Sequence, residues 1–181
     1  MNLTYSSYLK LPALLDMQQP QSDPPEHDEM LFIVIHQVYE LWFKLVLREL
    51  RAARTELAAP RVPEEKIPFV VHHLGRVTEI MKLLVDQFRV METLTPQDFL
   101  AFRDKLSPAS GFQSAQLREI EILAGLPEGE RIPLGHEKSY MQMLRNHDGS
   151  PSSASRRVDD RLADQPTLRE AVDEWLHRTP I

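Results

Sequence analysis

A long apolar stretch near the N-terminus, residues 27–46, constrains the fold of this chain more than any other feature. Its hydrophobic side chains recur at intervals of three and four residues, which is the period of a helix with a wide buried stripe. The stripe consists of Leu31, Val34, Ile35, Val38, Leu41, Trp42, Leu45 and Val46. One polar ring, His36, lies within this apolar face. The sequence therefore predicts a long core helix that carries a histidine.

His36 follows Phe32 by four residues, so the two side chains share one flank of the predicted helix. An unpaired buried hydrogen-bonding group costs about 1–3 kcal/mol, so this imidazole needs a partner. The partner is either another group of the protein or a bound ligand. A lone histidine on an apolar helix is more often a satisfied core residue, and the spacing alone leaves both interpretations open.

Composition and charge exclude several classes of protein. The chain has 181 residues, 42% of them hydrophobic and 27% charged, as expected for one globular domain with a real core. Its net charge of -6 argues against a general nucleic-acid binder, and the absence of cysteine rules out disulfides and thiolate chemistry. We see no signal peptide, and the longest apolar run, 30–35, is far shorter than a membrane span. A soluble, cytoplasmic protein is expected.

The hydrophobic periodicity predicts an all-α fold of one domain. Helices are expected at 28–57, 68–93, 95–105, 112–124 and from 166 to the end. The helix at 68–93 is expected to bury one face, which consists of Val71, Leu74, Val77, Met81, Leu84, Phe88 and Met91. Residues 1–17 form a docking segment and 18–26 a polar linker. We divide the chain into a helical core with the substrate-facing residues (1–125), a polar, partly mobile connection (126–165) and a last amphipathic helix (166–181).

Four residues stand out for their chemistry, because each of two aromatic rings precedes a polar group by one helical turn. They are Phe32 with His36, and Phe99 with Arg103. Arginine offers a planar fork for a carboxylate, phenylalanines contact a ring, and a neutral imidazole accepts a bond from an N–H group. Together they would suit a ligand with an aromatic ring and a carboxylate. An arginine in such a context is more often a surface or ion-pair residue, so this pocket is the minority interpretation on spacing alone.

Other motifs are weaker. His72 and His73 are adjacent and cannot face one metal ion from one side of a helix, and no pair of histidines has the helical spacing of a zinc site. The six glycines form no Gly-x-Gly or Walker-type loop. Ser110 and Gly111, just before a predicted helix, could offer backbone N–H groups to a ligand, although most such loops only cap the helix.

The motifs of this chain, in their order and spacing, resemble those of the tryptophan 2,3-dioxygenases. The resemblance is close over residues 3–125 and looser over 166–180. It is carried by Leu3-Thr4-Tyr5-x-x-Tyr8-Leu9, His27-Asp28-Glu29-Met30-Leu31-Phe32-Ile33, His36-Gln37, Glu40-Leu41-Trp42, Met91-Glu92-Thr93-Leu94-Thr95-Pro96, Phe102-Arg103-Asp104 and Ser107-Pro108-Ala109-Ser110-Gly111-Phe112-Gln113-Ser114. So many independent motifs do not coincide by chance.

The resemblance implies a helical bundle of the tryptophan/indoleamine dioxygenase type and an activity. Those enzymes are haem b-dependent homotetramers that insert both atoms of O2 across the indole C2–C3 bond of L-tryptophan, giving N-formylkynurenine in the kynurenine pathway of tryptophan catabolism. By the same resemblance, His36 is the catalytic residue on the distal side, facing the indole N–H, and Arg103 holds the substrate carboxylate. The other residues implied at the site are Phe32, Ile33, Val34, Ile35, Phe99, Ser110 and Gly111, with Tyr5, Tyr8 and Leu9 contributed by a neighbouring subunit.

The chain departs from the family pattern in its C-terminal part. It has no Gly-Gly pair like the one that holds the substrate ammonium in the family, and neither His147 nor His177 has the context of the proximal haem ligand. We therefore expect an N-terminal portion of such an enzyme, without a metal ligand of its own and inactive alone. One alternative is a non-catalytic helical interaction or regulatory module derived from the family. Another is an enzyme of the same superfamily that acts on a tryptophan analogue.

Overall fold

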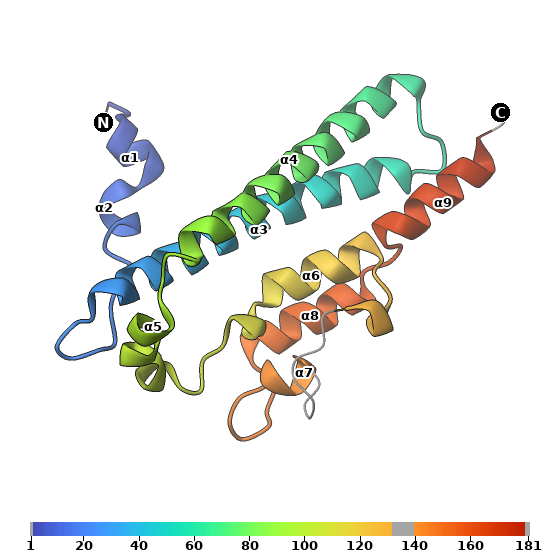
Figure 1. The fold of residues 1–181 in the computed structure, drawn as a ribbon. Helices are drawn as coiled ribbons and strands as arrows, with labels where there is room; N and C mark the ends of the chain where they lie inside the picture. The colour runs from blue at the N-terminus through green and yellow to red at the C-terminus, as the bar shows by residue number, and fades with distance from the viewer. Residues whose placement is uncertain (1, 132–139, 180–181) are drawn as a thin grey trace. The chain divides into compact units, whose positions relative to one another are not determined.

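The computed structural model describes residues 2–131 and 140–179 of the chain. Within these ranges every regular element is a helix and none is a strand, so the predicted all-α class is confirmed. Two helices dominate the fold, α3 (His27–Leu57) and α4 (Ile67–Met91) (Figure 1). The chain separates into two compact units, and both long helices contribute to each of them.

The first unit comprises Met1–Val38 and Gln87–Ser110. Besides the start of α3 and the end of α4, it contains α1 (Tyr5–Leu9), α2 (Leu11–Leu14), α5 (Pro96–Arg103) and the 3₁₀ helix η2 (Asp104–Leu106). Thr95 caps α5, because its hydroxyl oxygen accepts a hydrogen bond of 3.2 Å from the Asp98 N–H. Pro96 occupies the first helical position, where its missing N–H costs nothing. The capped start of α5 fixes the helix that carries Phe99 and Arg103.

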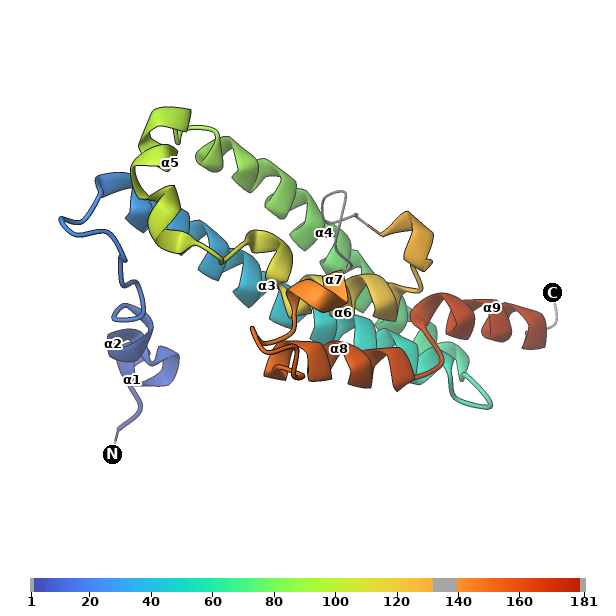
Figure 2. The same cartoon turned by 90° about the horizontal axis from the view of Figure 1, so that it is seen from below.

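The second unit comprises Tyr39–Asp86 and Gly111–Ile181. Its further elements are the 3₁₀ helices η1 (Glu64–Lys66), η3 (Gly111–Gln113) and η4 (Glu128–Glu130), with α6 (Ala115–Ala124), α7 (Tyr140–Met143), α8 (Ser153–Ala163) and α9 (Leu168–Arg178). α6 and α8 lie side by side (Figure 2). The main core joins α3, α4 and α6 through Phe43, Val46, Leu47, Leu50, Ile80, Leu84 and Leu123. Tyr39 adds a polar link across this core, donating to the Leu84 carbonyl at 2.7 Å.

The buried face of α4 differs from the predicted one. Leu84 is buried as expected, but Val71 and Phe88 are more than half exposed, and the other buried residues are Val70 and Ile80. The helix carries adjacent apolar residues at several points, so its sequence is compatible with two neighbouring stripes. Packing against α3 decides which residues are buried: of the predicted face, Leu74, Val77 and Leu84 contact the core, whereas Val71, Met81 and Phe88 are exposed.

The region 126–165, described from the sequence as a polar connection, contains the well-formed helix α8. Ser152 caps this helix by accepting from the Ser155 N–H at 3.0 Å. Its buried positions are Ser155, Val158 and Arg161, only one of which is apolar. Hydrophobic periodicity gave no signal here because α8 packs mainly through polar and charged groups. Residues 132–139 of this region lie outside the described part of the chain.

By length and composition, α3 is also apolar enough to cross a membrane. The core helix of a water-soluble protein meets the same criterion. The second half of α3 supplies Val46, Leu47 and Leu50 to the core, and it pairs Arg51 with Glu119 of α6 and Arg54 with Asp164 just after α8. We therefore assign α3 as a core helix.

Candidate functional site

Three phenylalanine rings meet in the first unit, where α5 packs against α3. Phe32 lies 5.6 Å from both Phe99 and Phe102, measured between ring centroids, and the last two rings are also 5.6 Å apart. Phe99 and Phe102 meet edge to face at 89°, a favourable arrangement for aromatic quadrupoles. Phe102 is fully buried, whereas the other two rings are only half-buried. The cluster therefore combines one buried ring with two rings that are partly open to solvent.

His36 packs directly on this cluster. Its ring centroid lies 4.1 Å from that of Phe32, and its Nδ1 atom is 2.7 Å from the backbone carbonyl oxygen of Phe32. A carbonyl oxygen can only accept, so Nδ1 must donate, and we assign the proton of the neutral imidazole to that atom. The Nε2 atom then carries a lone pair. The fold thus holds His36 as a hydrogen-bond acceptor toward any ligand on its Nε2 side.

Arg103 lies at the C-terminal end of α5, one turn after Phe99. A cation is stabilised at this end of a helix by the macrodipole. The side chain is half-buried, and among the described residues it has no hydrogen-bond or ion-pair partner. A guanidinium that no internal carboxylate neutralises is available to a carboxylate ligand. This placement suits the predicted role, which stays a prediction.

The remaining predicted site residues are dispersed. On α3, Ile33 is half-buried, Val34 is exposed and Ile35 is buried in the core. Ser110 ends the first unit, and Gly111 begins η3 in the second. The three residues expected to act in a neighbouring subunit, Tyr5, Tyr8 and Leu9, are exposed on α1. In the described part of the chain, ring contacts join Phe32 to His36 and to Phe99.

The sequence analysis missed Phe102 as a member of the cluster. It follows Phe99 by three residues, so both rings lie on one face of α5. That spacing is a signal that could have identified it.

A second omission is a buried carboxylate that ties the polar linker to α3. Glu29 is fully buried and accepts hydrogen bonds from the backbone N–H groups of Gln21, at 2.6 Å, and Ser22, at 3.0 Å. The Ser22 hydroxyl also donates to it. Burial disfavours the charged carboxylate, but these hydrogen bonds outweigh that effect and lower the pKa of Glu29. Glu29 therefore fixes the chain entering the helix that carries Phe32 and His36.

Gln37, the neighbour of His36, makes a similar attachment about two turns further along α3. Its Oε1 atom accepts from Gln18 Nε2 at 2.6 Å, and its Nε2 atom donates to the Met17 carbonyl at 3.1 Å. On the other side, Gln87 of α4 donates to the carbonyl of Ile35 at 3.3 Å. These amide contacts hold the His36 turn of α3 between the linker and α4.

The described residues do not by themselves make a site for haem, which the resemblance implies. A haem iron needs an axial ligand in an apolar slot. The ring of His36 is packed on Phe32, while His73 contacts Glu49 and His72 lies 2.8 Å from Arg76. His147 and His177 are exposed. In the described ranges no group of three or more histidine and acidic side chains could hold a metal ion.

Comparisons with known proteins identify the family of this chain. The family model described as tryptophan 2,3-dioxygenase matches residues 1–181. A tryptophan 2,3-dioxygenase of Sorangium cellulosum is 51% identical, over 99% of this chain and 44% of its own length. Tryptophan 2,3-dioxygenase 2 of Ralstonia nicotianae is 47% identical, over 99% of this chain and 49% of its own length. The tryptophan 2,3-dioxygenase of Dictyostelium discoideum is 42% identical, over 98% of this chain and 43% of its own length. The chain thus spans about half of these relatives, and it belongs to the tryptophan 2,3-dioxygenase family.

Proposed function

We propose that this chain supplies the tryptophan-recognition part of a tryptophan 2,3-dioxygenase, an enzyme that opens the indole ring of L-tryptophan with O2 to give N-formylkynurenine. Membership of the family and the names of the relatives support the activity. The haem b that carries the oxygen chemistry, the homotetrameric assembly and the cytoplasmic location are parts of the same proposal. Because the chain spans 44% of the Sorangium cellulosum relative, activity is expected only together with the remaining length.

The observation that carries the proposal is the orientation of His36. Its Nδ1 atom is engaged by the Phe32 carbonyl at 2.7 Å, which leaves Nε2 as an acceptor. An indole has one polar group on its ring, the N–H donor, so an acceptor beside aromatic rings matches it chemically. In this role His36 orients the indole by one hydrogen bond, and Phe32 and Phe99 contact its faces or edges. Haem, when bound, supplies the O2 chemistry.

Arg103 is proposed to bind the carboxylate of the amino acid. A guanidinium and a carboxylate form two parallel hydrogen bonds, and removing one partner of a desolvated charge pair commonly costs about 2–5 kcal/mol. His36 makes one neutral hydrogen bond, worth about 0.5–1.5 kcal/mol. Loss of Arg103 should therefore weaken tryptophan binding more than loss of His36. We further propose that Tyr5, Tyr8 and Leu9 complete the site of a neighbouring subunit.

The test of the Arg103 role compares ligands with and without a carboxylate. The chain is joined to the C-terminal segment of the Sorangium cellulosum relative, and binding of L-tryptophan and of tryptamine is measured by calorimetry. Arg103→Gln should weaken L-tryptophan binding by at least about thirtyfold, the equivalent of 2 kcal/mol, and leave tryptamine binding nearly unchanged. Arg48→Gln, at an exposed arginine of α3, serves as a control for the loss of one positive charge. Equal weakening of both ligands by Arg103→Gln would contradict the assignment, and no tryptophan binding to the unmodified fusion would favour a non-catalytic module.

A further inference from the structure

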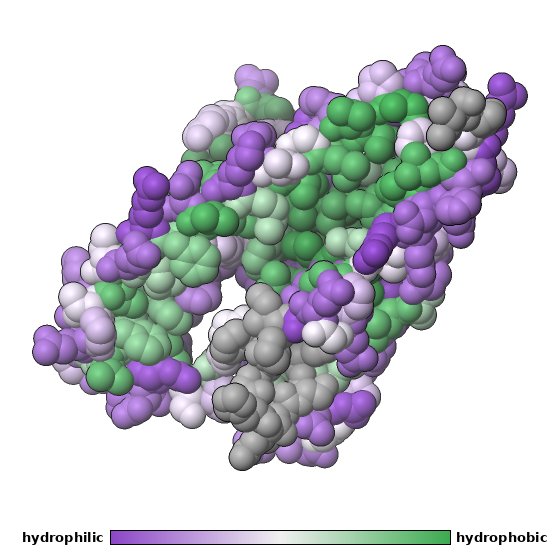
Figure 3. Space-filling model, turned by 45° about the vertical axis from the view of Figure 1, so that its right-hand side comes forward, coloured by the Kyte–Doolittle hydropathy of each residue, from purple (hydrophilic) through white to green (hydrophobic). Residues whose placement is uncertain are grey.

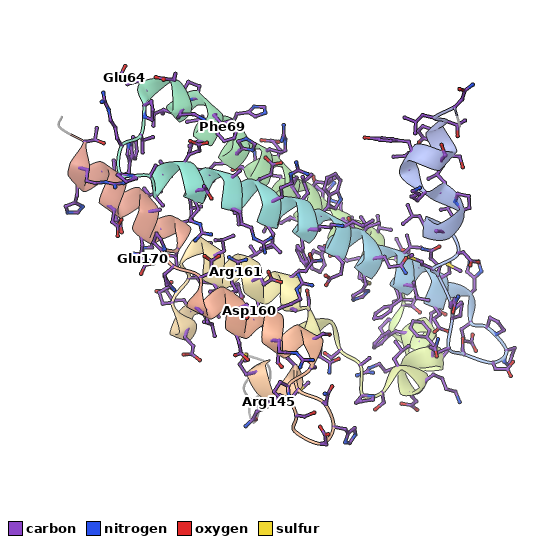
Figure 4. All side chains as sticks on the ribbon, turned by 180° about the vertical axis from the view of Figure 1, so that it is seen from behind. Glu64, Phe69, Arg145, Asp160, Arg161 and Glu170 are labelled. Carbon is purple, nitrogen blue, oxygen red and sulfur yellow. The ribbon has the colours of Figure 1, made fainter. Side chains whose placement is uncertain are left out.

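The second unit contains a cluster of arginines around two carboxylates, remote in sequence from the proposed tryptophan site. We call it the arginine cluster, and it consists of Arg51 and Arg54 of α3, Glu119 of α6, Arg157 and Arg161 of α8, and Asp164 just after α8. Figure 4 labels Arg161 and its neighbour Asp160 on α8. Neither the family resemblance nor the proposed function uses these residues.

Glu119 lies at the centre of the cluster and is nearly fully buried. One of its oxygens is 2.9 Å from Arg51 Nη2, and the other is 2.5 Å from Arg157 Nη2. Arg161 Nη2 approaches at 3.9 Å. One carboxylate is therefore shared by three guanidinium groups. Two of these, Arg51 and Arg157, are about half exposed and reach solvent beside the buried carboxylate.

Asp164 forms the second centre. Arg54 donates to both of its oxygens, at 2.9 and 3.0 Å, and Arg161 also contacts it. The hydrogen bonds from Arg54 lower the pKa of Asp164 against the opposing effect of burial, so this carboxylate is charged at neutral pH. Both carboxylates of the cluster are thus paired with arginines, although one oxygen of Glu119 accepts no hydrogen bond among the described residues.

The charges of the cluster do not balance. Four guanidinium groups face two carboxylates, which leaves two positive charges, and arginine does not lose its proton in proteins. The Nε atoms of Arg51, Arg54 and Arg161 are buried and have no hydrogen-bond partner. Burial lowers the pKa of Arg51, and the nearby charge of Arg161 lowers it further. Positive charge that is partly removed from water in this way attracts an additional anion.

We propose that the arginine cluster is a binding site for a small tetrahedral oxyanion of the phosphate class. The anion would lie at the solvent side of Glu119 and receive hydrogen bonds from the outer edges of Arg51 and Arg157. These two guanidinium groups each use one Nη atom for Glu119, so their other donors are available to the ligand. Arg54 and Arg161, held deeper by Asp164, add a long-range attraction. A dianion would bring the charge of the whole cluster to zero.

The chain offers a matched pair of variants for the test. Arg156 and Arg157 are adjacent and exposed on α8, but only Arg157 contacts Glu119. Arg156→Gln and Arg157→Gln thus remove the same charge from the same helix and differ only in contact with the cluster. Arg157→Lys is a second variant, which keeps the charge but loses the planar fork. Circular dichroism of each variant establishes that it is folded.

Binding of inorganic phosphate to the full chain is measured by calorimetry, with sodium chloride at matched ionic strength as reference. We expect saturable binding of one phosphate per chain, weakened about tenfold or more by Arg157→Gln, less by Arg157→Lys, and less than twofold by Arg156→Gln. Glycerol 3-phosphate serves as a second probe. A site for free phosphate would exclude this ester, whereas a site for phosphate esters would bind it as tightly as phosphate. Equal effects of the two glutamine variants, or no difference between phosphate and chloride, would overturn the proposal and indicate an adventitious ion only.

Discussion

At the scale of single residues, the fold depends on a few carboxylates that are buried and yet charged. Glu29 is held by the N–H groups of Gln21 and Ser22, and Glu49 by His73 and Arg76. For both acids burial opposes ionisation, but the surrounding donors prevail and lower the pKa below its ordinary value of about 4.5. Glu29 ties the linker to the start of α3 and Glu49 ties α3 to α4, so the charge of each contributes to the stability of the packing.

The linker attachment can be tested by Glu29→Gln. The amide retains one oxygen acceptor but turns an NH2 group toward the N–H donors of Gln21 and Ser22, so we expect the free energy of unfolding to fall by about 1–3 kcal/mol in urea denaturation. The matched control is Glu79→Gln, at an exposed glutamate paired only with Lys82, which should change stability by less than about 0.5 kcal/mol. Equal effects of the two substitutions would show that Glu29 does not hold the linker.

The same carboxylates predict how stability depends on pH. An acid whose pKa is lower in the folded state stabilises the fold fully above its unfolded pKa, and this contribution disappears as the pH falls through the folded value. For Glu29 and Glu49 the loss should therefore begin below about pH 4.5. Urea unfolding between pH 6 and 3 is expected to show a steep loss for the natural chain and a shallower one for Glu29→Gln. Parallel curves would contradict the role assigned to the Glu29 charge.

At the scale of helices, the junction between α6 and α9 depends on a glycine. Gly125 ends α6 with a φ of 89°, and a Cβ atom there would lie 2.6 Å from the Cβ atom of Arg169. Gly125→Ala should therefore lower the free energy of unfolding by more than about 1 kcal/mol. Gly75, within α4, has no neighbour within 4 Å of its added Cβ, so Gly75→Ala should raise stability by about 0.5–1 kcal/mol. Thermal unfolding that shows the same sign for both changes would refute this account of the junction.

Helix positions show which structural features the sequence could predict. The apolar period located α3 and α4, and the Thr95-Pro96 pair located the start of α5. The apolar period could not locate α8, whose buried side includes Ser155 and Arg161, because the packing of α8 depends on charge pairing with α6. Nor could it select the buried stripe of α4, where apolar residues occur on two neighbouring faces.

The candidate site was predictable to a similar degree. The spacing of four residues placed His36 beside Phe32, because that contact lies within one helix. The meeting of Phe32 with Phe99 joins two helices far apart in the sequence, and it was suggested by the family resemblance rather than by the pattern. The hydrogen bond that orients His36 and the attachment through Glu29 depend on backbone geometry, which a sequence pattern does not contain.

At the scale of the whole molecule, much apolar surface is exposed. Tyr5, Tyr8 and Leu15 of the N-terminal segment are at least two-thirds exposed. Figure 3 shows further hydrophobic surface on one face of the molecule, and Val71 and Val85 of α4 are also exposed. Surfaces of this kind mark association sites in proteins. The proposed role of Tyr5 and Tyr8 in a neighbouring subunit requires that the N-terminal segment be one of them.

We therefore expect the chain to self-associate through its N-terminal segment. Sedimentation velocity at micromolar concentration should show a dimer or larger species, and Tyr5→Ser/Tyr8→Ser should shift it toward the monomer. The control is Val71→Ser/Val85→Ser, which removes two exposed apolar side chains from α4 instead and should leave the association intact. A monomeric natural chain, or dissociation caused only by the α4 variant, would count against exchange of the N-terminal segments.

The central claim is that His36 accepts a hydrogen bond from the indole N–H of tryptophan, and a cycle of two ligands and two proteins tests it most directly. The ligands are L-tryptophan and its benzofuran analogue, in which an oxygen replaces the N–H without changing the shape. The proteins are the fusion with the Sorangium cellulosum C-terminal segment and its His36→Ala variant. The fusion that retains His36 should bind L-tryptophan about 2- to 13-fold more tightly than the analogue, the equivalent of 0.5–1.5 kcal/mol. The His36→Ala variant should bind both ligands equally. An equal preference in both proteins would contradict the account.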